Sequence, residues 1–292
     1  MDFKKLLICA VTVVMFFGSA FALNIVATIN PYYLIVKDMV KDVSGVSVSL
    51  LIKPGSDPHT FSPSVSDVKL LAKADIIFAN GLGLDNAYLK NYKSVVYLGE
   101  YIPKDKLSKD EVHVEDEHGE EYEEGYNPHV WLSPEFLAKY IVPKIRDELS
   151  KKDARNAERY KIHTKEIITS LTNISSKFDK LLSGRKNAVV ILDHPSYFYL
   201  FKRYNIDILS VEEGHGKQPS AKHIKEIVEE AKKNKLIGIF VGPQFNKSGI
   251  ETISKELKRN YKILDPIGAK AKSITELFES AYVSIKEALD GK

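Results

Sequence analysis

The chain has 292 residues, 44% of them hydrophobic and 28% charged, a composition that excludes a disordered chain, a collagen and a coiled coil. This length is sufficient for about two domains of ordinary size. The 42 Lys and Arg residues nearly balance the 39 Asp and Glu residues, so the formal charge of +3 gives no electrostatic reason to expect nucleic acid as the main ligand.

The first 22 residues have the three parts of a secretory signal peptide. Charged side chains lie within residues 1–5, an apolar run occupies residues 6–22, and the run ends in the sequence Ala-Phe-Ala. This arrangement predicts cleavage after Ala22 and a mature chain in the periplasm or on the external cell surface. An uncleaved N-terminal anchor is the alternative, because 17 apolar residues are at the short limit for a membrane span.

In the rest of the chain, segments rich in Val, Ile and Leu alternate with amphipathic segments of helix length. This alternation is typical of parallel sheets covered by helices. The expected strands form two groups of four: residues 24–29, 46–52, 75–79 and 95–98, then residues 188–192, 206–211, 236–241 and 261–264. We therefore predict an α/β fold with two similar lobes, each a mainly parallel four-stranded sheet flanked by helices.

An acidic segment at residues 110–124 follows the first group of strands. Nine of its fifteen residues are Asp or Glu, two are His113 and His118, and none is basic. Such a segment cannot be part of a hydrophobic core, so we expect a solvent-exposed loop. A weak role in gathering metal ions is the alternative, because divalent cations bind carboxylates and imidazoles.

Between the two groups of strands, residues 150–182 contain neither Gly nor Pro. Apolar residues recur there at alternating steps of four and three, at positions 167, 171, 174, 178 and 181. The spacing predicts one long helix with an apolar face, about 45 Å long for some 30 residues, which Gly184 would end. We expect this helix, residues 150–184, to connect an N-terminal lobe of residues 23–149 to a C-terminal lobe of residues 185–292.

Four short segments place an Asp or Asn, a Pro and usually a His near the end of a strand or the start of a helix. They are Asp57-Pro58-His59, Asn127-Pro128-His129, Asp193-His194-Pro195 and Asp265-Pro266. Proline lacks a backbone N–H and keeps the preceding residue extended, so regular structure should end at each segment. In open α/β sheets such strand ends line the ligand crevice. Two segments lie in each half of the chain, so lobes that face each other would bring three imidazoles and a carboxylate together.

These four ligands, His59, His129, His194 and Asp265, suit Zn²⁺. Imidazole nitrogens and one carboxylate oxygen complete a four-coordinate zinc site, whereas calcium and magnesium prefer oxygen. Manganese usually takes more oxygen ligands than this set offers, and Mn²⁺ is the alternative cofactor.

Besides His113 and His118 of the acidic segment, three histidines lie outside these four segments. His163 and His223 occur in polar helical stretches, and we expect them to be surface or hydrogen-bonded residues. His215 follows the expected strand at residues 206–211 and is a candidate auxiliary ligand, because it could overhang the same crevice.

Six segments carry motifs that extend over essentially the whole mature chain: residues 54–63, 127–134, 193–199, 218–222, 243–245 and 264–268. Together they resemble the motifs of periplasmic-type solute-binding proteins that deliver zinc or manganese to ABC importers. The resemblance implies that His59, His129, His194 and Asp265 are the metal ligands. In the family a His at the third position goes with many zinc binders and a Glu with manganese binders, so His194 favours zinc.

The resemblance thus implies a zinc receptor that delivers its ion to the permease and ATPase of an ABC importer, and we expect a monomer. A manganese receptor and a metal-dependent surface adhesin are the alternatives. A zinc hydrolase is the alternative from another class, since zinc with an open coordination position activates water. Four protein ligands would leave no such position, and the sequence has no HExxH motif, so we do not expect an enzyme.

Overall fold

The computed structural model describes residues 22–109, 125–213 and 218–291. The predicted signal peptide as far as residue 21, the acidic segment at residues 110–124 and His215 lie outside the described residues. Among the described helices, none combines the length and the apolar character that a membrane span needs.

The N-terminal lobe is a parallel four-stranded sheet with the strand order β2-β1-β3-β4. Its strands are β1 (Leu23–Ala27), β2 (Val46–Leu50), β3 (Ile76–Ala79) and β4 (Val95–Tyr97). The helices of this lobe are α1 (Asn30–Met39), α2 (Val65–Ala72) and α3 (Asn86–Leu89). The inner strand β3 is buried at all four positions, in keeping with its continuously apolar sequence.

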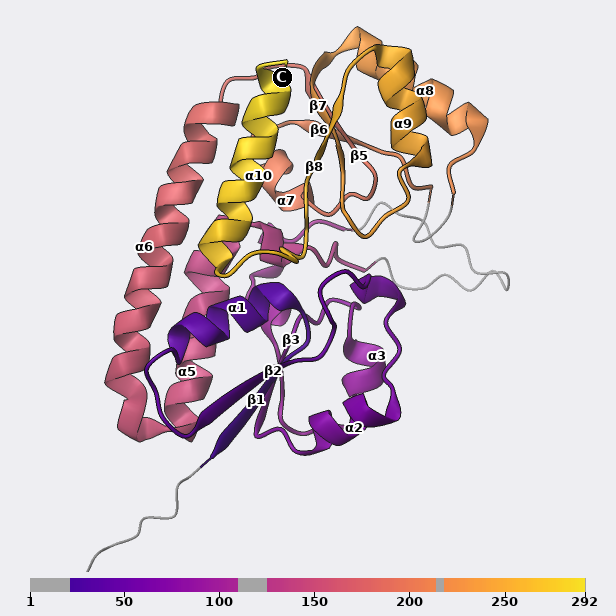
Figure 1. The fold of residues 1–292 in the computed structure, drawn as a ribbon. Helices are drawn as coiled ribbons and strands as arrows, with labels where there is room; N and C mark the ends of the chain where they lie inside the picture. The colour runs from indigo at the N-terminus through magenta and orange to yellow at the C-terminus, as the bar shows by residue number, and fades with distance from the viewer. Residues whose placement is uncertain (1–21, 110–124, 214–217, 292) are drawn as a thin grey trace, which may run out of the picture.

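The C-terminal lobe repeats this arrangement with the strand order β6-β5-β7-β8, again all parallel (Figure 1). Its strands are β5 (Ala188–Leu192), β6 (Asp207–Ser210), β7 (Lys235–Val241) and β8 (Tyr261–Ile263). Its helices are α7 (Phe198–Lys202), α8 (Ala221–Lys233), α9 (Ser248–Leu257) and α10 (Ile274–Leu289). All eight predicted strands are present within two residues of their predicted ends, and the predicted α/β fold with two similar lobes is confirmed.

Short helical segments connect the sheets and the long helix. The single-turn segments are η1 (Pro58–Thr60), η2 (Leu98–Tyr101), η3 (Lys104–Lys106), η4 (Val130–Leu132) and η6 (Ala154–Asn156). Between η4 and η6 the chain forms α4 (Pro134–Phe136), the π-helical segment η5 (Leu137–Ile141) and α5 (Val142–Lys152). Pro143 has no N–H to donate to the carbonyl of residue 139, which accounts for the altered hydrogen bonding of η5.

The long connecting helix is α6 (Ala157–Leu182), which runs beside both lobes (Figure 1). It begins seven residues later than predicted, because residues 150–152 complete α5 and Asp153 leaves the helical conformation with φ −135° and ψ 71°. Its apolar face is the predicted one except at its end, where Leu182 is buried in place of Leu181. Gly184 follows in the left-handed region with φ +76°, as a residue that ends a helix commonly does.

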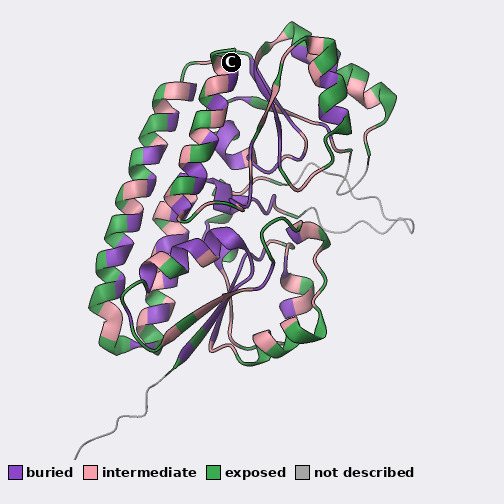
Figure 2. Cartoon of the chain, in the orientation of Figure 1, coloured by how far each residue is buried: buried purple, intermediate pink, exposed green. Residues whose placement is uncertain are grey.

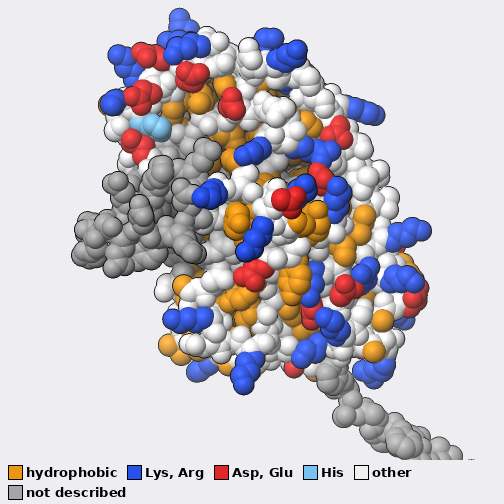
Figure 3. Space-filling view, turned by 180° about the vertical axis from the view of Figure 1, so that it is seen from behind, with side chains coloured by type: hydrophobic (Ala, Val, Ile, Leu, Met, Phe, Trp, Pro, Cys, Tyr) orange, Lys and Arg blue, Asp and Glu red, His pale blue; other side chains and the backbone are white. Residues whose placement is uncertain are grey.

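The hydrophobic core is shared by the two lobes. One cluster of buried side chains runs from the N-terminal sheet through Trp131 and the buried face of α6 to Tyr197 and Ile267 of the C-terminal lobe. A second, smaller cluster lies between the C-terminal sheet and helices α8 and α9. Figure 2 shows buried residues continuing from one lobe into the other, so the two lobes pack against each other instead of being held by a linker alone. On the face seen in Figure 3, basic and acidic side chains are interspersed.

Candidate metal centre

His59 comes from the loop after β2, where a short local motif holds it. It lies in the single turn η1, and the Asp57 carboxylate accepts a hydrogen bond of 3.0 Å from the backbone N–H of His59. Pro58 occupies the first position of this turn, where its missing N–H has no cost. The Asp-Pro-His sequence therefore builds its own cap and fixes the backbone at His59.

His129 lies directly before η4 and only 2% of its surface is exposed. The side-chain oxygen of Asn127 accepts from the backbone N–H of His129 at 3.1 Å and from the His129 ring nitrogen Nδ1 at 2.9 Å. Asn80, at the end of β3, in turn donates to the carbonyl oxygen of Pro128 at 3.0 Å. This segment is thus held both by its own asparagine and by the N-terminal sheet.

His194 follows β5 in the C-terminal lobe and is also 2% exposed. Its Nδ1 lies 2.5 Å from a carboxylate oxygen of Glu212, which follows the neighbouring strand β6. The ring of Phe245 stacks on the His194 ring, with centroids 5.1 Å apart and an interplanar angle of 24°. A carboxylate and an aromatic ring therefore fix the orientation of this imidazole.

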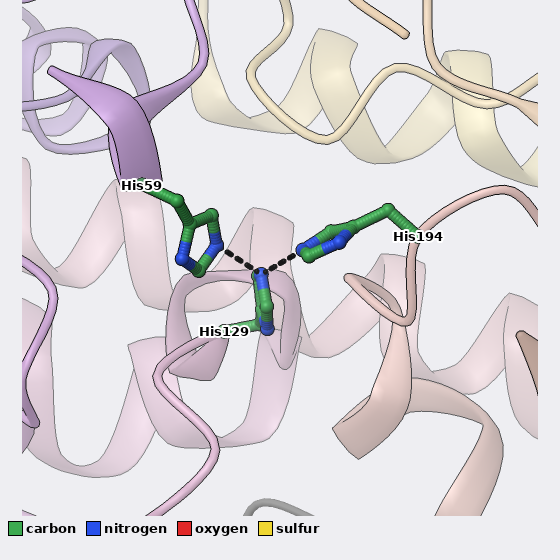
Figure 4. Close-up of side chains that lie close together, drawn as sticks. All are labelled: His59, His129 and His194. Atoms are coloured by element: carbon green, nitrogen blue, oxygen red, sulfur yellow. Dashed lines mark hydrogen bonds between the residues drawn. The ribbon is translucent and has the colours of Figure 1, made fainter. Parts of the chain in front are cut away.

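The three imidazoles meet at one point between the lobes (Figure 4). The Nε2 atom of His129 lies 3.0 Å from Nε2 of His59 and 2.9 Å from Nε2 of His194. Among the described residues, these three side chains form the cluster whose ligand atoms all lie within 4.8 Å of one another. The Nδ1 atoms of His129 and His194 face hydrogen-bond acceptors, so Nδ1 carries the proton and Nε2 offers its lone pair to the shared point.

The spacing of the nitrogens is close to that of a zinc site. With Zn–N bonds of 2.0–2.1 Å and tetrahedral angles, two ligand nitrogens lie about 3.4 Å apart. The observed separations of 3.0 Å and 2.9 Å need only a few tenths of an ångström of expansion. Three neutral nitrogen donors that converge in this way fit a divalent metal ion of zinc's size and ligand preference.

Asp265 lies two residues beyond β8 and does not belong to the histidine cluster. Its carboxylate accepts hydrogen bonds from the Gln244 side chain and from the backbone N–H groups of Ile267 and Ala269. The hydroxyl of Tyr197 donates to its backbone carbonyl at 2.8 Å. The structure therefore brings together three of the four predicted ligands and places the carboxylate beside the site, firmly held.

Burial affects one further carboxylate next to the site. Desolvation raises the pKa of Asp193 to about 7, against the lowering effect of hydrogen bonds from the backbone N–H groups of Gly242 and His194. The Gly242 N–H donates to the Asp193 carboxylate at 2.9 Å. This bond ties the end of β5 to the end of β7, at the turn that carries His194.

The sequence did not identify Glu212 or Gln244 as functional residues. Each follows a strand that the sequence predicted, and in a parallel sheet the residues after neighbouring strands lie at the same edge. Its position after a strand could have identified Glu212, since β6 lies next to β5, the strand that precedes His194. A position after a strand does not predict which polar side chain at that edge of the sheet faces the ligand.

The remaining described histidines are hydrogen-bonded, as predicted. His163 is buried on α6 and its Nδ1 lies 2.8 Å from the Met39 carbonyl oxygen. His223 lies on α8 with its Nε2 at 2.9 Å from the Ser210 carbonyl oxygen. The proposed auxiliary ligand His215 lies outside the described residues.

Comparison with known proteins places the chain among metal-binding proteins. The model of the family described as zinc-uptake complex component A, periplasmic, matches residues 25–288. A putative metal-binding protein of Thermotoga maritima is 36% identical over 288 residues, which cover 98% of this chain and 99% of that protein. The manganese ABC transporter substrate-binding lipoprotein scaA of Streptococcus gordonii is 31% identical over 257 residues, 82% of this chain and 78% of that protein.

The fold is also found among solved structures. The crystal structure of ZnuA has a TM-score of 0.76 with this chain at 24% sequence identity, covering 91% of this chain and 98% of that one. This likeness shows that the two lobes and their connecting helix form a known architecture.

Proposed function

The chain belongs to the zinc-uptake complex component A periplasmic family, a family of solute-binding receptors, and from this premise we propose that its cargo is a single zinc ion. The proposed ligands are His59, His129, His194 and Asp265. The chain captures zinc outside the cytoplasm and delivers it to the permease of an ABC importer, which is driven by an ATPase on the other side of the membrane. Binding and release are the whole of its activity, since a closed shell of four protein ligands leaves no position for a reactive water.

One observation carries this proposal: the Nε2 atoms of three histidines from both lobes converge. Those of His59 and His194 lie 3.0 Å and 2.9 Å from Nε2 of His129. Without a cation, the Nε2 lone pairs of His129 and His194, 2.9 Å apart, gain nothing from facing each other. With zinc, each lone pair gains a bond, and the acceptors at Asn127 and Glu212 hold the rings in the ligating orientation. The cluster is therefore built for a metal ion.

Zinc is favoured over manganese by the composition of the site. Three imidazoles and one carboxylate give three nitrogen donors and one oxygen donor, and manganese prefers a larger share of oxygen. The similarity to a relative named as a manganese ABC transporter substrate-binding lipoprotein supports manganese as the second candidate cargo.

The location and the assembly are part of the same proposal. The signal peptide at residues 1–22 would export the chain, and a receptor for an importer must work on the side from which the ion enters. We propose a monomer with an N-terminal lobe at residues 23–149, a connecting segment at residues 150–184 and a C-terminal lobe at residues 185–292. Each chain then carries one complete site.

Native mass spectrometry before and after treatment with a chelator tests the cargo. We expect one zinc ion per chain, removed by the chelator and restored by zinc, and no such ion in the His194→Ala variant. Unchanged zinc stoichiometry in that variant would contradict the ligand assignment, and restoration by manganese in preference to zinc would assign the cargo to manganese.

A further inference from the structure

Gln244 is in contact with both the cavity at the histidine cluster and Asp265. It follows β7, and its side chain lines the same small cavity as His59, His129 and His194. Its Nε2 donates a hydrogen bond of 2.9 Å to Oδ1 of Asp265. The side chain is therefore in a position to decide which part of the Asp265 carboxylate a metal ion can reach.

Counting the hydrogen bonds of Asp265 shows which oxygen is left for a metal ion. Each carboxylate oxygen offers about two acceptor positions. Oδ1 accepts from Gln244 Nε2 and from the Ile267 backbone N–H at 3.0 Å, so both of its positions are used. From the part of the chain that the structure describes, Oδ2 accepts one bond of 2.7 Å, from the Ala269 backbone N–H, which leaves it one position. Only Oδ2 can therefore take a metal ion without losing a hydrogen bond.

Among the described residues, Asp265 is the hydrogen-bond partner that sets the orientation of the Gln244 amide. The opposite orientation would place the amide oxygen against a carboxylate oxygen and would replace an attraction by a repulsion. In the observed orientation the amide Oε1 is buried and has no hydrogen-bond partner among the described residues. A buried oxygen without a donor is costly, so the bond to Asp265 outweighs that cost.

Gly242 makes room for this arrangement. A Cβ atom at position 242 would lie 3.0 Å from Gln244 Oε1 and 2.7 Å from a ring carbon of Phe245, which stacks on His194. Both contacts are shorter than packed side chains normally make. The glycine thus allows residues 244 and 245 to fold onto the site.

We propose that Gln244 is a positioning residue that limits Asp265 to one metal-ligating oxygen and thereby favours zinc over manganese. A single oxygen with three imidazole nitrogens gives the four-coordinate shell that zinc prefers. If Oδ1 were free, the carboxylate could bind through both oxygens, and the added oxygen ligand would suit manganese better. The inference rests on the proposed function, because it takes Asp265 as the fourth ligand of the bound ion.

Substitution of Gln244 by methionine, which has a similar size and no N–H, tests the proposal. Zinc and manganese affinities are measured by competition with a chelator, and the visible absorption of the Co²⁺-loaded protein reports the coordination number. We expect the zinc-over-manganese affinity ratio of Gln244→Met to fall on the order of tenfold, the scale of one hydrogen bond to a charged group. We also expect the intense absorption of four-coordinate Co²⁺ to weaken.

Two further variants complete the design. Gln218→Met is the matched control, because Gln218 is exposed and does not line the cavity, and it should keep the ratio and the spectrum of the unmodified protein. Gln244→Glu keeps the shape of glutamine but repels the Asp265 carboxylate, so it should change both readouts in the same direction as Gln244→Met. It also serves as the test if the methionine variant does not fold.

The possible outcomes separate this inference from the proposed function. If the unmodified protein and Gln218→Met bind zinc tightly while Gln244→Met keeps their affinity ratio and Co²⁺ spectrum, the role of Gln244 is wrong and the receptor function stands. Equal weakening of zinc and manganese binding with an unchanged spectrum overturns the inference in the same way. Absence of tight zinc binding in the unmodified protein overturns the proposed function itself.

Discussion

The N-terminal and C-terminal lobes have the same strand order, yet they support their histidines differently. In the N-terminal lobe, Nδ1 of His129 faces the neutral amide oxygen of Asn127, two residues away in the chain. In the C-terminal lobe, Nδ1 of His194 faces the carboxylate of Glu212, which follows the neighbouring strand. An imidazole that is hydrogen-bonded to a carboxylate is a stronger metal ligand than one hydrogen-bonded to an amide, so we infer that the C-terminal lobe supplies the stronger ligand.

The two lobes are joined by hydrogen bonds in the interior and by an ion pair at the surface. Inside, the Asn30 side chain at the start of α1 donates to the carbonyl oxygens of Ile267 and Gly268, and the Trp131 indole N–H donates to the Pro266 carbonyl at 2.9 Å. At the surface, Arg203 pairs with Glu135. The buried bonds join the N-terminal lobe to the segment that carries Asp265. We therefore expect the lobes to move relative to each other by only a small rocking.

Removal of His129 should have the largest effect, because its nitrogen contacts the nitrogens contributed by both lobes. Loss of an outer-shell partner alone typically costs 10–100-fold in metal affinity, and we expect His129→Ala to weaken zinc binding by more than about 100-fold. Isothermal titration calorimetry measures this. His223→Ala is the control, since His223 binds the Ser210 carbonyl away from the cluster. Equal zinc affinities in the two variants would contradict the assignment of His129.

Zinc should stabilise both lobes together, because it takes ligands from each. At about 100 times its Kd, zinc should add about 2.7 kcal/mol to the free energy of unfolding at neutral pH. The ligating imidazoles must be neutral, so the added stability should disappear as the pH falls below the ordinary histidine pKa of about 6.5. Thermal unfolding with and without zinc at several pH values measures this difference. A zinc-induced shift that persisted at pH of about 4 would argue against imidazole ligands.

Substitutions of the acceptors behind the two histidines test the comparison between the lobes directly. We expect Glu212→Ala to reduce zinc affinity toward the upper end of the 10–100-fold range, and Asn127→Ala toward the lower end. Glu213→Ala is the control, because the Glu213 carboxylate accepts from the Ser220 backbone N–H instead of from a histidine. If both acceptor variants lose the same affinity, the charge of Glu212 does not distinguish the lobes.

Loss of the buried contact at Asn30 should weaken the joint between the lobes. Asn30→Ala leaves the carbonyl oxygens of Ile267 and Gly268 without this donor, at a cost of about 1–3 kcal/mol in the free energy of unfolding. Denaturant unfolding measures this cost. Asn24→Ala is the control, because the hydrogen bonds of the Asn24 side chain within the described residues are exposed. Two variants of equal stability would show that the bond across the lobes contributes little.

The surface ion pair at Glu135 should have the smallest effect. A hydrogen bond from Lys139, then the charge of Arg203, lowers the pKa of Glu135, although partial desolvation opposes this. A lowered pKa means that the stabilisation is present above the unfolded value of about 4.3 and is lost as the pH falls through the folded value. Glu135→Gln should therefore lower the free energy of unfolding by less than about 1 kcal/mol at pH 7. At low pH the variant and the unmodified protein should be equally stable.

Urea unfolding of Glu135→Gln at neutral and acidic pH checks the direction of this dependence. The matched control is Glu226→Gln, since Glu226 and its partner Lys222 both lie on α8 within one lobe. A larger loss for Glu135→Gln at acidic pH than at neutral pH would contradict the assigned sign.

Local sequence patterns determined much of the fold. The eight strands and the apolar face of α6 follow from hydrophobic periodicity, which depends on residues a few positions apart. The positions of His59, His129 and His194 could be predicted because each adjoins a proline that ends regular structure. Near the end of α6 the periodicity predicted that Leu181 is buried, but Leu182 is the buried residue. Neighbouring positions on a helix differ by only 100°, so packing decides between them.

Tertiary structure decided which side chains surround the proposed metal ligands. Glu212 lies 18 residues from His194 and reaches it because β6 pairs with β5, and Gln244 reaches Asp265 across 21 residues because β7 pairs with β8. Asn30 and Gly268 are separated by 238 residues and meet because the lobes pack together. Sequence spacing carries no information on such distances, since hydrogen bonds form between groups within about 3 Å in space, wherever the chain order places them.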